Sequence, residues 1–104
     1  MVLGDFEGTI NPDYPLSGYP LFNAPQSVTA VISDAGYDVM DLAHNHILDS
    51  GLEGAFTTAD AFKEVGIDPV GVYENPVRDK APLFIKNVNG IKVAILSYAY
   101  GFNG

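Results

Sequence analysis

The 104-residue sequence contains no cysteine and no tryptophan. The lack of cysteine excludes a disulfide framework, a thiolate metal site and a cysteine nucleophile. No uncharged apolar run approaches the roughly 20 residues that span a bilayer. The first residues also lack the basic region and apolar stretch of a signal peptide. We therefore expect this chain, as it stands, to be soluble.

Basic residues are scarce and unevenly placed. Five Lys and Arg stand against 13 Asp and Glu, which gives a formal net charge of −8, and no Lys or Arg occurs in residues 1–62. Such an acidic half repels nucleic-acid phosphates and anionic lipid, so we expect no nucleic-acid partner. A bound cation would relieve the repulsion between these carboxylates, and solvated acidity that aids solubility is the alternative interpretation.

The apolar content of 47% is typical of a globular chain, and the length allows one domain or part of one. Residues 8–25 are rich in Gly, Pro, Asn and Ser, which predicts a surface loop. A helix is expected over residues 24–35, with Asn23 as its N-cap. Its buried face would consist of Val28, Val31, Ile32 and Ala35.

A second helix is expected from residue 51 to about residue 65, where Ser50 and Glu53 form a capping box. Its apolar stripe would consist of Leu52, Phe56, Ala59 and Phe62.

Short strands are expected at residues 37–42 and 67–70, and residues 2–3 resemble the tail of a strand. Asn89-Gly90 predicts a hairpin between residues 83–88 and 91–98. The expected order is strand end–loop–helix–strand–helix–strand–β-hairpin, which indicates an α/β fold with parallel strands. Because both ends look cut, we interpret residues 1–104 as a single segment of a larger domain, truncated at both ends.

Two polar clusters follow the predicted strands. Asp5 and Glu7 come after the first strand tail, and His44, Asn45 and His46 come after the second strand. In open α/β sheets such positions share the ligand-binding edge. Carboxylate, amide and imidazole groups suit Mn²⁺, Fe²⁺ or Zn²⁺, and a histidine there can move a proton.

Structural interpretations of the same residues stay open. Asp5 and Glu7 can belong to a simple turn, and the His-Asn-His segment can be ordinary loop structure before a helix. Asp49 precedes the second helix, and we interpret it as favouring the helix dipole.

Several segments together resemble the CapA/PgsA family of bacterial capsule and poly-γ-glutamate biosynthesis proteins. Residues 2–9 resemble its N-L-E-G segment, and residues 18–25 its loop before the first helix. Residues 36–49 are similar to its G-F-D-V-V-S-L-A-N-N-H-x-L-D motif. Residues 89–98 match a later strand, and residues 100–104 match its Y-G-T-N-G ending.

The resemblance implies a partial calcineurin-like metallophosphatase α/β sandwich. It implies that Glu7 and Asn45 are metal ligands and that His46 is the catalytic residue that assists the transferred phosphoryl group. Asp5 and His44 replace the family's usual asparagines, and we expect them to be supporting metal ligands. The superfamily's first Asp-containing motif and its late histidines have no counterpart in this sequence, so a complete two-metal centre requires other residues.

The resemblance further implies a capsule or poly-γ-glutamate biosynthesis protein with a metal-dependent hydrolase site that is incomplete in this segment. The divalent metal would be Mn, Fe or Zn, with one or two ions in the longer protein. The alternative is a non-catalytic scaffold that binds or exports polymer in the cell envelope.

The expected partners are an anionic capsule polymer or a phosphate ester, together with other capsule-synthesis membrane proteins. The longer protein would lie outside the cytoplasmic membrane on an anchor. Exposed sheet edges also predict a homodimer formed by edge-strand pairing.

Overall fold

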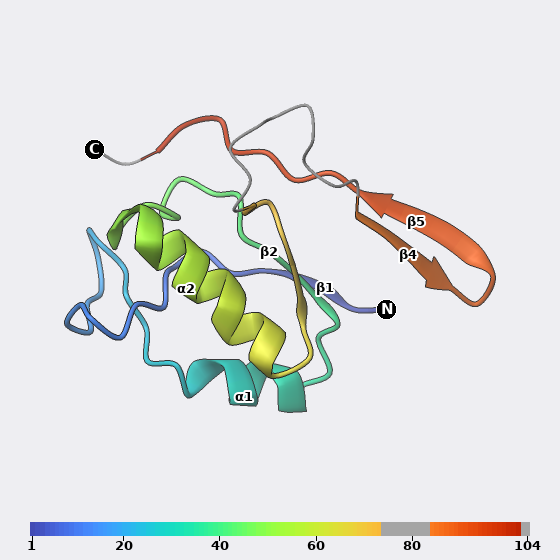
Figure 1. Cartoon of the computed structure of the whole chain (residues 1–104), viewed down its shortest axis with the longest axis horizontal. Coiled ribbons are helices and arrows are strands. Elements are labelled where there is room, and N and C mark those ends of the chain that lie inside the picture. The colour runs from blue at the N-terminus through green and yellow to red at the C-terminus, as the bar shows by residue number, and fades with distance from the viewer. Residues whose placement is uncertain (74–83, 103–104) are drawn as a thin grey trace.

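The computed structural model describes residues 1–73 and 84–102 as a mixed α/β structure (Figure 1). In chain order the elements are β1 (Leu3–Asp5), α1 (Val28–Asp34), β2 (Val39–Asp41), α2 (Gly51–Glu64), β3 (Asp68–Val70), β4 (Phe84–Val88) and β5 (Ile91–Ile95). The predicted α/β class with parallel strands is confirmed, because β1, β2 and β3 form a parallel sheet in that order. β4 and β5 form a separate antiparallel pair.

The parallel register brings the ends of β1 and β2 together. Asp5 is paired with Asp41 across the two strands, and Asp41 is paired with Val70 of β3. Val39 and Met40 of the central strand are buried. The sheet therefore places the residues that follow β1 and β2 at one edge.

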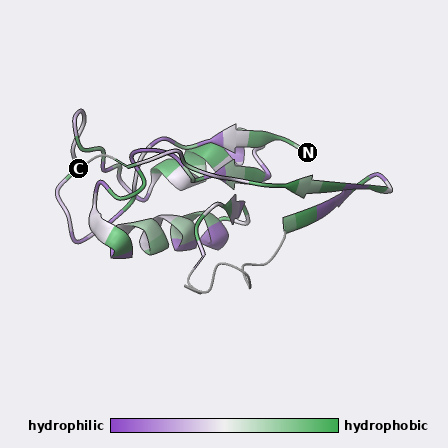
Figure 2. Cartoon of the chain, turned by 90° about the horizontal axis from the view of Figure 1, so that it is seen from above, coloured by the Kyte–Doolittle hydropathy of each residue, from purple (hydrophilic) through white to green (hydrophobic). Residues whose placement is uncertain are grey.

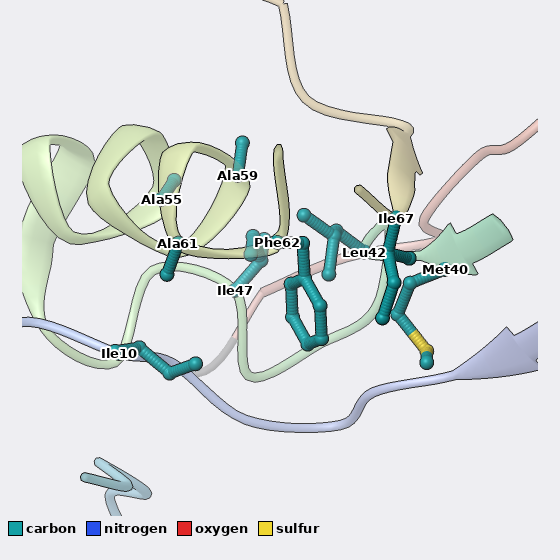
Figure 3. Packing of buried hydrophobic residues seen from close by; sticks show 9 residues of the cluster. All are labelled: Ile10, Met40, Leu42, Ile47, Ala55, Ala59, Ala61, Phe62 and Ile67. Atoms are coloured by element: carbon teal, nitrogen blue, oxygen red, sulfur yellow. The ribbon is translucent and has the colours of Figure 1, made fainter. Parts of the chain in front are cut away.

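The core lies between α2 and the sheet, and its centre is Phe62 (Figure 3). The Phe62 side chain is fully buried, and its ring meets the edge of Phe6 at a centroid distance of 5.1 Å. The other buried members of this cluster come from the sheet, from α2 and from the loops beside them: Ile10, Met40, Leu42, Ile47, Ala55, Ala59, Ala61 and Ile67.

The second helix forms where the sequence predicts it, but its predicted capping box is wrong. Ser50 occupies the N-cap position without a side-chain cap hydrogen bond. Its hydroxyl instead donates to Thr9 Oγ1 at 2.8 Å, so this buried side chain joins the start of α2 to the buried beginning of the loop. Leu52 is also 64% exposed, so the apolar stripe begins later than expected.

The first helix is shorter than predicted. It begins at Val28, and its N-cap position is Ser27 rather than Asn23. The Asn23 side chain is buried and hydrogen-bonds the backbone of residue 11 in both directions, so it organises the preceding loop.

The predicted buried face of this helix is only partly correct. Val28 and Ile32 pack against the core, whereas Val31 and Ala35 are exposed. Thr29 is the buried residue of α1.

The predicted surface loop at residues 8–25 has a buried beginning. Thr9, Ile10 and Asn11 are buried, and the Ile10 N–H donates to Thr58 Oγ1 of α2 at 2.7 Å. The expectation of an exposed loop holds for residues 12–21, all of which are exposed.

The predicted hairpin is confirmed, with Asn89 (φ 52°) and Gly90 (φ 88°) both in the left-handed region that its tight turn requires. β5 ends at Ile95 rather than residue 98, and Leu83 of the expected first strand lies outside the described residues. Figures 1 and 2 show the hairpin projecting away from the rest of the chain. No helix among the described residues is long and apolar enough to cross a membrane.

Candidate functional site

The two predicted polar clusters meet at one pocket of about 420 Å³ at the carboxyl edge of β1 and β2. Four of the five predicted site residues line it: Asp5, Glu7, His44 and Asn45. The pocket is also lined by residues that follow the hairpin: Tyr98, Ala99, Tyr100, Gly101 and Phe102. Sequence patterns did not predict these lining residues, because only the tertiary fold brings the segment after the hairpin to this edge.

Carboxylates crowd this edge. Burial raises the pKa of Asp5, and the neighbouring charges of Asp41 and Glu7 raise it further, while His44 opposes them. Asp41 Oδ1 accepts hydrogen bonds from the Ala43 N–H at 3.0 Å and from the Ser97 hydroxyl. The edge thus concentrates negative charge, which a bound cation would stabilise.

His44 is 6% exposed, and its ring is fixed by the segment that follows it. Its Nδ1 accepts the backbone N–H of His46 at 3.1 Å. A neutral imidazole whose Nδ1 accepts carries its proton on Nε2. That Nε2 atom is buried and has no hydrogen-bond partner among the described residues.

Burial lowers the pKa of His44, against the opposing effect of the carboxylates of Asp5 and Glu7. The neutral ring is therefore favoured. Metal ligation through Nε2 would require the other tautomer and would break the hydrogen bond from His46 N–H. The geometry accordingly suits His44 as a hydrogen-bond donor better than as a metal ligand.

His46 does not line the pocket with the other four residues. His46 lies next to a pocket-lining residue, with its ring centroid 6.5 Å from that of His44. Its Nδ1 is 2.7 Å from Asp49 Oδ2, and the edge of an aromatic ring, Phe22, contacts the imidazole at a centroid distance of 4.5 Å. The sequence analysis did not predict either of these two contacts of His46.

The carboxylate of Asp49 is occupied by partners other than the helix end. Besides facing His46, its Oδ2 accepts the Phe22 N–H at 2.8 Å. The expected interaction with the dipole of α2 is therefore not the contact that fixes this side chain.

The donor set suits a divalent metal chemically, because the pocket combines carboxylate and amide oxygens with a concentration of negative charge. In residues 1–73 and 84–102, however, no group of three or more His, Cys, Asp or Glu side chains converges on a position where they could hold one ion. The described residues alone therefore do not form a complete metal site.

Comparison with known proteins identifies relatives of this chain. It is 38% identical over 80 residues to the capsule biosynthesis protein CapA of Bacillus anthracis, a match that covers 77% of this chain and 19% of the relative. It is 29% identical over 68 residues to the PGA biosynthesis protein CapA of Bacillus subtilis, covering 65% of this chain and 18% of the relative. The uncharacterized protein y4sH of Sinorhizobium fredii is 37% identical over 67 residues, covering 64% of this chain and 14% of the relative.

The chain thus spans less than a fifth of the length of each of these relatives. No solved structure matches it. The profile of one family, described as bacterial capsule synthesis protein PGA_cap, matches residues 1–104. The chain belongs to this family of bacterial capsule synthesis proteins.

Proposed function

We propose that this chain contributes part of a metal-dependent, metallophosphatase-like hydrolase site to a capsule or poly-γ-glutamate biosynthesis protein. One observation carries the proposal: Asp5, Glu7 and Asn45 line a single pocket at the carboxyl edge of parallel strands. This edge is where open α/β sheets bind ligands. The name of the Bacillus subtilis relative, a PGA biosynthesis protein, supports poly-γ-glutamate as the polymer.

The proposed metal ligands are the carboxylates of Asp5 and Glu7 and the side-chain oxygen of Asn45. The remaining ligands would come from other residues of the longer protein, since no group of three or more His, Cys, Asp or Glu side chains converges on one ion among the described residues. Bound Mn²⁺, Fe²⁺ or Zn²⁺ would act as a Lewis acid on a phosphoryl or carbonyl oxygen. A bound cation would favour the charged form of the Asp5 carboxyl, whose pKa burial and neighbouring carboxylates raise.

The two histidines take different parts in this proposal. His44, with its proton on Nε2, would donate a hydrogen bond to a group bound in the pocket. His46, whose Nδ1 faces a carboxylate, would carry its lone pair on Nε2 and serve as the proton-transferring residue.

The proposed substrate is an anionic capsule polymer or a phosphate ester. None of the pocket-lining side chains among residues 1–73 and 84–102 is Lys or Arg, so an anionic substrate would need the cation to offset the charge of Asp5 and Glu7. The proposed location is the outer side of the cytoplasmic membrane, together with other capsule-synthesis membrane proteins.

The need for a cation between an anionic polymer and the acidic pocket also supports a second function, that of a non-catalytic scaffold that binds polymer through the metal. Polymer binding that requires Mn²⁺ or Zn²⁺ but proceeds without hydrolysis by the longer protein would favour the scaffold.

Calorimetric titration of Mn²⁺ and Zn²⁺ into this chain tests the metal site. We expect saturable binding that is lost in the Glu7→Ala/Asn45→Ala variant. Glu53→Ala is the matched control, because it removes an exposed carboxylate of α2 away from the pocket and should bind like the unaltered chain. Equal binding by the double variant and the control would contradict the proposed ligands.

A further inference from the structure

The His46 side chain is contacted by two residues. Asp49 lies close to it in sequence, in the turn before α2, and Phe22 comes from the distant loop. Asp49 Oδ2 lies 2.7 Å from His46 Nδ1, and these side chains are only 11% and 1% exposed. The Phe22 ring meets the imidazole edge-on. The Phe22 backbone N–H donates to the same carboxylate oxygen at 2.8 Å. One oxygen therefore joins the loop, the histidine and the start of α2.

Burial of the Asp49 carboxylate lowers the stability of the fold. Asp49 Oδ1 is buried and has no hydrogen-bond partner within the part of the chain that the structure describes. A buried carboxylate with one unsatisfied oxygen costs free energy that an uncharged side chain would avoid. The other oxygen, Oδ2, accepts the Phe22 N–H and lies within hydrogen-bond distance of His46 Nδ1.

We propose that Asp49 is a positioning residue that holds His46 in the Nδ1–H tautomer and that Phe22 fixes the plane of its ring. Because a carboxylate only accepts hydrogen bonds, the nitrogen facing it must carry the proton. The neutral ring then has its lone pair on Nε2, the form needed for a base or a metal ligand.

The use of that lone pair rests on the proposed function, whereas the tautomer itself does not. Loss of metal binding would overturn the proposed function and leave this inference standing. A different tautomer would overturn this inference and leave the proposed ligands Asp5, Glu7 and Asn45 standing.

Two-bond ¹H–¹⁵N correlation spectra of the ¹⁵N-labelled chain test the inference directly. The chain has two histidines, so the His44→Gln variant assigns the signals of His46. Spectra are recorded at rising pH until the ring nitrogens stop shifting, so that the neutral ring is observed. We expect a protonated Nδ1 and an unprotonated Nε2 in His46.

Asp49→Ala should shift His46 towards the Nε2–H tautomer, because the acceptor at Nδ1 is gone. Asp49→Asn should keep the Nδ1–H tautomer, since its amide oxygen can accept from both His46 and Phe22. Asp60→Ala is the matched control, because it removes a largely exposed carboxylate from α2 and should leave the spectrum of His46 unchanged.

An Nε2–H tautomer in the unaltered chain would overturn the proposal, and this result does not depend on whether any Asp49 variant folds. An unchanged Nδ1–H tautomer in folded Asp49→Ala would overturn it as well. If Asp49→Asn keeps the Nδ1–H tautomer and Asp49→Ala loses it, the result supports positioning by the acceptor oxygen at residue 49 rather than by its charge.

Discussion

Two regions of the molecule are built from equally clear sequence patterns but are stabilised differently. The body, residues 1–73, buries a hydrophobic cluster between α2 and the parallel sheet. The hairpin, residues 84–95, forms a complete antiparallel ladder, yet Ile85 and Ile91 remain 53% and 68% exposed. Lys86 links it to the body through an ion pair with Asp68 at 3.0 Å. Local pattern thus decides which elements form, whereas burial decides where the folding free energy lies.

The largest effect is expected at the centre of the body. Phe62→Ala should lower the free energy of unfolding by about 3–5 kcal/mol, because it leaves a cavity at a fully buried site and removes the edge contact with Phe6. Urea unfolding followed by circular dichroism measures this change.

Ile85→Ala in the hairpin is the matched control. Its side chain is already half exposed, so the change should stay within about 1 kcal/mol. Equal losses for the two variants would break the comparison, since they would mean that the hairpin is packed as tightly as the body.

The helix caps show where local sequence rules fail. Asn23 and Ser50 have the residue types of N-caps, but both side chains are used in a buried network around Thr9 and Asn11. Irregular backbone inside a protein must find hydrogen-bond partners, and an exposed helix end can use water instead. The sequence does not show that the beginning of the loop is buried. It therefore cannot show whether Asn23 and Ser50 cap a helix or hydrogen-bond the buried loop.

The candidate site was predictable to the level of topology. Strand ends in a parallel sheet meet at one edge, which is why Asp5, Glu7 and Asn45 share a pocket. The environments of the two histidines were not predictable. The contact between Phe22 and Asp49 spans 27 residues, and the ring of His44 is fixed by a backbone N–H rather than by a side-chain pattern.

A smaller and more local effect is expected in the hairpin turn. Gly90 has a φ of 88°, a conformation that an L-residue adopts at a cost of roughly 1 kcal/mol. Gly90→Ala should therefore accelerate amide hydrogen exchange in β4 and β5 while leaving exchange in α2 unchanged. Acceleration in α2 of the same size would show that the hairpin and the body unfold as one unit.

The smallest change in the free energy of unfolding is expected at the carboxylate edge of the body. The hairpin has no such cluster of like charges, because residues 84–95 contain no acidic side chain. The pKa of Asp5 is raised by burial and by Asp41 and Glu7, so the folded state holds its proton more tightly than the unfolded state. The charged form consequently destabilises the fold at neutral pH, and this penalty disappears as the pH falls through the raised pKa towards the ordinary aspartate pKa of 3.8.

Asp5→Asn should thus stabilise the chain at pH 7 by about 0.3–1 kcal/mol, a modest value because solvent screens this exposed side chain. The gain should shrink towards zero in unfolding experiments at progressively lower pH. Asp13→Asn removes the same charge from an exposed loop outside the pocket and should change little at either pH. A gain at pH 7 that persisted in acid would locate the benefit in packing or hydrogen bonding. A gain that vanished would show that the charge of the carboxylate edge reduces stability, a penalty that the proposed cation would offset.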